Sequence, residues 1–94
     1  MHIRNLREKK VLILGFGKEG QAMHKALRKL FPKKVLGVAD KSSLVPKKDS
    51  KTTFHLGKKY LQALKHYGVI IKSPGISDAI PSRFQKRLIS PTQI

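Results

Sequence analysis

A short apolar run passes directly into a glycine-rich segment near the start of the chain. Residues Val11–Leu14 read VLIL, and the next six residues read GFGKEG. Four consecutive apolar residues are typical of a strand that is covered on both faces in a parallel sheet. Gly15 permits a tight turn, Gly17 lets the backbone approach a ligand, and Gly20 allows a helix to pack closely on the strand. The stretch therefore predicts a strand, a glycine loop and a helix in that order.

An amphipathic helix is expected directly after the glycine loop. The apolar residues there recur at spacings of three and four, which is the period of a helix. Pro32 ends the pattern because proline cannot continue a helix at that point. The face that we expect to be buried consists of Met23, Ala26, Leu27, Leu30 and Phe31.

The rest of the chain repeats this alternation. Val35–Val38 predicts a second buried strand, and residues 41–53 predict a surface connection. Further strands are expected at 53–56, at 69–71 and from Leu88, with a short helix at 81–87. A second helix, which ends near Gly68, is expected to bury Tyr60, Leu61, Leu64 and Tyr67. Such alternation predicts an α/β fold: one Rossmann-like, mononucleotide-binding domain over residues 1–94, with a parallel sheet flanked by helices.

Composition excludes several other classes of site. The chain has no cysteine, and its four histidines lack the close spacing of metal ligands, so we expect no metal site. No apolar run reaches the length of a membrane span, and the N-terminal MHIRNLREKK has no apolar block typical of a signal peptide. We therefore expect a soluble, cytoplasmic protein without a membrane partner.

The chain is strongly basic, with 21 lysines and arginines against five acidic residues and a formal charge of +16. Such a charge favours polyanions. The basic residues are spread over every segment, however, and no aromatic side chains alternate with them as stacking platforms. We expect a solvated basic surface, or one half of a larger protein whose remainder carries compensating acid. A small nucleic-acid-binding module is the alternative.

In parallel sheets of this kind, ligands bind beyond the carboxyl ends of the strands. Three segments are expected at that position: Gly15–Gly20, Asp40–Ser42 and Ser73–Ser77. The glycine loop opens a helix, whose first amides and dipole attract an anion, so the first segment predicts a phosphate site. The alternative is that the glycines serve only a tight turn between strand and helix.

Several polar residues are candidates for contacts with the rest of a nucleotide. Asp40 follows the second strand, where a carboxylate can accept hydrogen bonds from ribose hydroxyls; the alternative role is a helix or turn cap. Lys41 and Ser42 are candidates for ribose or phosphate contacts. Lys18 is placed to neutralise a phosphate, although solvation is its alternative, and Glu19 is interpreted as support for the first turn of the helix. These residues do not choose between NAD and another nucleotide, so an NAD-binding Rossmann domain of a dehydrogenase or regulator is an alternative.

A family resemblance narrows the choice. The segments VLILGFGKEGQA, VADKS, VIIKSPGIS and LISPTQI occur in the order found in the N-terminal domain of the Mur ligases. The resemblance covers residues 10–94, and KSPGI after a strand is its most specific element. It is strongest to the members that add D-glutamate to UDP-N-acetylmuramoyl-L-alanine during peptidoglycan synthesis.

The resemblance implies a role for each candidate residue. The first domain of this family holds the UDP part of the substrate, the central domain holds ATP, and the third domain receives the amino acid. Carried over by position, this places the diphosphate among Gly17, Lys18, Glu19 and Gly20, the uridine near Asp40, Lys41 and Ser42, and the nucleotide-sugar at Ser73 and Gly75. The chain departs from the usual family pattern at Glu19, where a small or hydroxyl residue is common, and at Lys41–Ser42, where an arginine is common.

The chain lacks the other parts of such an enzyme. No GxxxxGK[ST] motif occurs, so the phosphate cradle and the magnesium ligand of an ATP site are absent from these 94 residues. We expect no catalytic residue and no cofactor in this chain; ATP and magnesium would belong to the parent ligase. A truncated piece that lacks the central and C-terminal domains is the expectation, and a natural minimal protein is the alternative.

Overall fold

The computed structural model describes residues 3–43, 49–73 and 80–89, without the side chains of residues 3–5. Within these ranges the chain forms a five-stranded, all-parallel sheet in the order β3-β2-β1-β4-β5. The strands are β1 (Val11–Leu14), β2 (Leu36–Asp40), β3 (Thr52–Leu56), β4 (Val69–Lys72) and β5 (Leu88–Ile89). The fold is therefore α/β and Rossmann-like, as the sequence predicts, and β1 lies where the strand order reverses direction.

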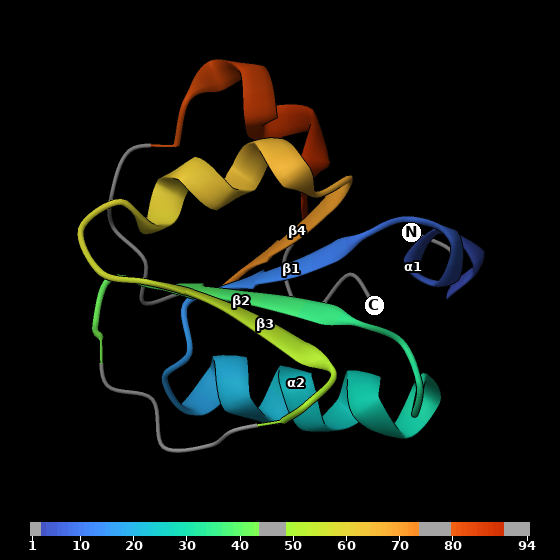
Figure 1. Ribbon diagram of the computed structural model, residues 1–94. Coiled ribbons are helices and arrows are strands. Elements are labelled where there is room, and N and C mark those ends of the chain that lie inside the picture. The colour runs from blue at the N-terminus through green and yellow to red at the C-terminus, as the bar shows by residue number, and fades with distance from the viewer. Residues whose placement is uncertain (1–2, 44–48, 74–79, 90–94) are drawn as a thin grey trace.

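Helices cover both faces of the sheet (Figure 1). The α-helix α2 (Lys18–Leu30) packs against one face, and the 3₁₀-helices η1 (Tyr60–His66) and η2 (Ser82–Arg87) pack against the other. A short α-helix, α1 (Ile3–Glu8), precedes β1 and was not predicted.

The two faces of β1 supply two separate core layers. Val11 and Ile13 belong to the layer on the α2 side, whereas Leu12 and Leu14 belong to the layer on the η1 side. All four side chains are at most 1% exposed, because successive residues of a strand point to opposite faces. The apolar run that predicted β1 is therefore explained by burial on both sides.

The buried face of α2 differs from the predicted one. Leu27 and Phe31 are buried and Met23 is partly buried, but Ala26 is exposed and Leu30 is 50% exposed. His24 is buried in their place. Its burial is possible because its Nε2 lies 2.8 Å from Oγ1 of Thr52, so the ring has a polar partner inside the protein.

Other predicted elements differ from the structure in their first residue or in the type of helix. The second strand begins at Leu36, and Val35 before it is 57% exposed. The connection predicted at residues 41–53 ends earlier, because β3 begins at Thr52. The two helices expected after β3 are 3₁₀-helices, and η1 buries Tyr60, Ala63 and Leu64, while Leu61 and Tyr67 are only partly buried.

No helix in the described ranges is long and apolar enough to cross a membrane.

Candidate functional site

The glycine loop lies at the carboxyl ends of the central strands. The backbone amide of Gly15 donates to the carbonyl of Ala39 in β2 at 2.7 Å. The amide of Ser73, directly after β4, donates to the carbonyl of Leu14 in β1 at 2.9 Å. These bonds tie Gly15 to the residue before Asp40, and Ser73 to the residue before Gly15, so the starts of the three predicted segments lie at the same edge of the sheet.

Each glycine of the loop has a different environment. Gly15 has a φ of 95°, a conformation that side-chain-bearing residues rarely adopt. A Cβ at Gly20 would overlap the carbonyl oxygen of Gly15, so the start of α2 can lie this close to the loop only without a side chain there. A Cβ at Gly17 would have no atom within 4 Å, so the backbone of Gly17 faces open space.

The open space at Gly17 adjoins the N-terminus of α2. Gly17 is the N-cap of this helix and provides no side-chain hydrogen bond to it, so the cap leaves the first-turn amides available to an external acceptor. Lys18 and Glu19 follow in the first turn, and both are exposed. The helix dipole and the amides favour an anion here, whereas the carboxylate of Glu19 supports the helix and competes with that anion.

Asp40 is joined to the glycine loop. Its Oδ2 accepts the backbone amide of Phe16 at 2.6 Å, and its Oδ1 accepts the amide of Ser42 at 2.8 Å. The second bond is the turn role that the sequence left as an alternative. A carboxylate has about four lone-pair positions, so Asp40 retains capacity to accept a ribose hydroxyl. The ribose role stays a prediction.

Ser73 also holds the glycine loop. Its side chain is buried at 6% exposure, and its Oγ donates to the carbonyl of Gly15 at 3.1 Å. The hydroxyl oxygen can still accept one hydrogen bond. Its first role in the structure is to fix the turn at Gly15, and the predicted contact with a nucleotide-sugar stays a prediction.

The remaining candidates are less defined by their surroundings. Lys41 and Ser42 are exposed and both take part in further interactions. Gly75 and the rest of the segment up to Ser77 lie outside the described residues. Of that third segment, the structure therefore places only Ser73 at the loop.

Sequence reasoning missed one polar cluster beside α2. Arg28 donates from Nε and Nη2 to Oδ2 of Asp49 at 3.0 and 2.6 Å, and Oγ1 of Thr52 donates to the same oxygen at 2.8 Å. His24 completes the cluster through Thr52. A signal for His24 was present, because Gly20, His24, Leu27 and Phe31 follow spacings of four, three and four. We name these four residues, His24, Arg28, Asp49 and Thr52, the α2 clamp.

Two cavities lie beside β3 and η1, on the face of the sheet opposite α2. Neither cavity is lined by residues of the glycine loop. No group of three or more potential metal ligands occurs among the residues that the structure describes.

No family model, no curated protein and no solved structure matches the chain. Its function is therefore inferred from the geometry of the site and from the sequence motifs.

Proposed function

We propose that the chain is a nucleotide-binding domain that holds the UDP part of UDP-N-acetylmuramoyl-L-alanine, as the N-terminal domain of a D-glutamate-adding Mur ligase. The observation that carries this proposal is the open backbone at Gly17, at the start of α2 and beside Asp40 and Ser73. The choice of UDP rests on the resemblance of the sequence motifs.

The diphosphate would lie against the first amides of α2. Backbone amides at a helix N-terminus bind phosphate through hydrogen bonds and the helix dipole. Lys18 supplies a cation in the same turn, and Asp40 offers remaining acceptor capacity toward the ribose. The contribution of such a domain to the ligase reaction is positioning, which orients the reacting carboxyl end of the substrate. The family resemblance implies that ATP and the amino acid bind to other domains of the parent enzyme.

NAD is the competing ligand. The strand order is that of a dinucleotide-binding fold, and a carboxylate at the end of β2 is where such folds bind an adenosine ribose. The glycine loop by itself does not distinguish the diphosphate of UDP from that of NAD. The competition between the two ligands is therefore the decisive measurement.

The test is an amide-resolved NMR titration of the whole chain with UDP-N-acetylmuramoyl-L-alanine and with NAD at equal concentrations. We expect the UDP ligand to shift the resonances of Gly15–Gly20, Asp40–Ser42 and Ser73 more than NAD does. Gly17→Ala places a methyl group in the open space, so it should reduce UDP-ligand affinity about tenfold or more by displacing the diphosphate.

Gly68→Ala is the matched control, because Gly68 lies directly before β4, at the amino end of that strand and not at the carboxyl end where the glycine loop lies. The three atoms nearest to a Cβ there all belong to the side chain of Lys9, the first at 3.3 Å. Gly68→Ala should leave the affinity unchanged. A stronger, equally localised response to NAD would replace the ligase proposal with a dinucleotide-binding one. Equal losses in both variants would remove the glycine loop from the site.

A further inference from the structure

One part of the sheet lacks large apolar side chains on the η1 side. Leu36 and Val38 of β2 point into the core beside α2, so Gly37 and Ala39 face the η1 side. In the parallel register, Gly37 pairs with Thr53 and Ala39 pairs with His55 of β3. Because these positions carry small or polar residues, the core on this side is thin at the β2–β3 edge.

The ring of Tyr67 covers part of this gap. A Cβ at Gly37 would overlap the Tyr67 ring, so the ring lies directly on the backbone of β2. The Tyr67 hydroxyl is 2.8 Å from Nε2 of His55, and the two rings meet edge to face with centroids 5.6 Å apart. This pair fixes the His55 ring in a half-buried position.

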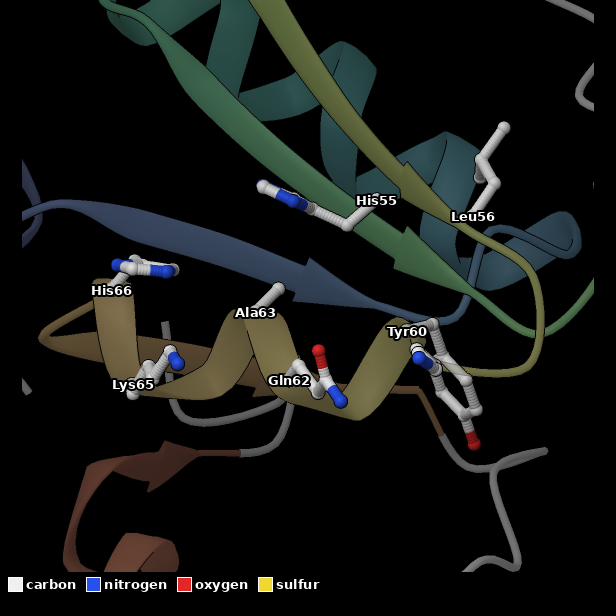
Figure 2. A pocket seen from close by; sticks show the side chains of 8 residues that line it. His55, Leu56, Tyr60, Gln62, Ala63, Lys65 and His66 are labelled. Carbon is white, nitrogen blue, oxygen red and sulfur yellow. The ribbon is translucent and has the colours of Figure 1, made fainter.

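Two cavities remain beside this pair, with volumes of about 330 and 430 Å³. Both are lined by His55 and His66, and we name them together the histidine hollow. Figure 2 shows the ring of His55, from β3, over the small side chain of Ala63, and the ring of His66 at the end of η1 on the same side of that helix. The two imidazoles therefore face a shared space.

The charges around the histidine hollow are all of one sign. Two lysines of the η1 region line the first cavity, and two lysines at the amino ends of β1 and β2 line the second. No aspartate or glutamate lines either cavity among the described residues. The Lys34 ammonium is held at the rim by a hydrogen bond to the carbonyl of Arg7 at 3.0 Å. The cationic and titratable residues that line the hollow are Lys10, Lys34, His55, Lys59, Tyr60, Lys65, His66 and Tyr67.

We propose that the histidine hollow binds the phosphate group of a phosphorylated ligand, at a second site separate from the glycine loop. The His66 ring and Nδ1 of His55, whose Nε2 is already paired with the Tyr67 hydroxyl, supply directional N–H donors. The lysines supply positive charge without a competing carboxylate. The cavity volumes are large enough for a phosphate with an attached group. Free phosphate compounds and the backbone of single-stranded nucleic acid both carry this chemistry.

Electrostatics in the hollow support an anionic ligand. Burial, followed by the charge of nearby His66, lowers the pKa of His55 below its ordinary value. A bound phosphate would offset the repulsion between the two rings and raise the pKa of His55. Binding would therefore take up a proton, and affinity should increase as the pH is lowered.

The test is an NMR titration of the whole chain with inorganic pyrophosphate, observing the histidine side chains and the backbone amides at about pH 6 and about pH 8. We expect saturable shifts at His55, Ala63 and His66, with affinity several-fold higher at the lower pH. His66→Gln and Lys65→Gln alter exposed side chains, so the fold should be retained, and each should reduce affinity about fivefold.

Lys25→Gln is the matched control, because Lys25 is an exposed lysine on α2, on the opposite face of the sheet. It removes the same charge as Lys65→Gln and should leave the affinity at His66 unchanged. Equal losses in Lys25→Gln and Lys65→Gln would show a diffuse attraction to the basic surface and overturn the proposal. Shifts confined to residues 15–20 would also overturn it.

A single-stranded oligonucleotide, titrated under the same conditions, separates the two sources of phosphate. Tighter binding of the oligonucleotide with the same histidine footprint assigns the hollow to a nucleic acid backbone. Saturable pyrophosphate binding without an oligonucleotide footprint at these residues assigns it to a small phosphorylated ligand. The Gly17→Ala variant should bind pyrophosphate in the histidine hollow as the unaltered chain does. A failure of the proposed UDP site at the glycine loop can therefore be told apart from a failure of the phosphate site in the hollow.

Discussion

At the scale of single residues, Gly17 and Gly20 have different surroundings within the glycine loop. Both are glycines of one motif, but a Cβ at Gly20 meets the backbone of Gly15 and a Cβ at Gly17 meets nothing. A backbone atom cannot yield as the end of a flexible side chain can. The same motif therefore contains one position that the fold restricts and one position that faces open space.

We predict that Gly20→Ala lowers the free energy of unfolding by about 1–3 kcal/mol, because the added methyl group forces α2 away from the loop. Gly17→Ala should cost less than about 1 kcal/mol, the loss expected when alanine replaces glycine at an N-cap. Urea unfolding of both variants measures the difference. Similar losses in the two variants would show that Gly17 also has a folding role.

At this scale, the sequence predicted correctly those features that are determined by neighbouring residues in the chain. Gly15 was assigned a tight turn, and its φ of 95° confirms it. The bond from the Phe16 amide to Asp40, 24 residues away, has no local signal. The position of the Tyr67 ring over Gly37 has no local signal either. The small residues Gly37 and Ala39 show only that this face of β2 carries no large side chain.

At the scale of elements, the α2 clamp joins α2 to the segment that begins β3. Arg28 donates to Asp49 and also to the carbonyls of Phe31 and Lys34, at 3.2 and 2.5 Å. Hydrogen bonds from the Lys51 amide and the Thr52 hydroxyl, together with Arg28, lower the pKa of Asp49 to about 2. The apolar period of α2 could not reveal this clamp, because its partners lie more than 20 residues away.

The folded-state pKa of Asp49 lies below its ordinary value of 3.8, so its contribution to stability is present above that value and is lost as the pH falls toward 2. We predict that Asp49→Asn is less stable than the unaltered chain at neutral pH, by roughly 1 kcal/mol after allowance for the partial exposure of the pair. The difference should shrink as the pH is lowered from about 4 to about 2.

Urea midpoints measured across this pH range check the prediction. Glu8→Gln is the control, since it removes an exposed carboxylate of α1 that has no part in the α2 clamp. A stability difference for Asp49→Asn that is independent of pH would assign the effect to altered packing and not to the charge of the clamp.

Prediction of whole elements succeeded where burial leaves a pattern in the sequence. The run Val11–Leu14 corresponds to β1, because both faces of this strand are covered. Val35 was wrongly added to β2, since an apolar residue next to a buried run gives the same signal whether or not it is covered. The apolar spacing of η1 also does not distinguish a 3₁₀-helix from an α-helix.

At the scale of the whole molecule, the formal charge of +16 on 94 residues opposes compaction through self-repulsion. We predict that the urea midpoint rises when NaCl is increased from about 0.01 to about 0.15 M, where the Debye length falls from about 30 to about 8 Å. A Lys25→Gln/Lys29→Gln variant, which loses two exposed charges of α2, should show a smaller rise. A midpoint that falls with salt would indicate that favourable ion pairs outweigh the repulsion.

The hydrogen bonds from Phe16 to Asp40 and from Ser73 to Gly15 also have a consequence for association with a ligand. They hold the glycine loop in one backbone conformation in the free protein. Ordering one residue costs about 1–2 kcal/mol of conformational entropy, and in this loop that cost is met during folding. For the proposed nucleotide, affinity at the loop would therefore be set by the contacts that the ligand makes, because preorganisation has already removed the penalty for arranging the backbone.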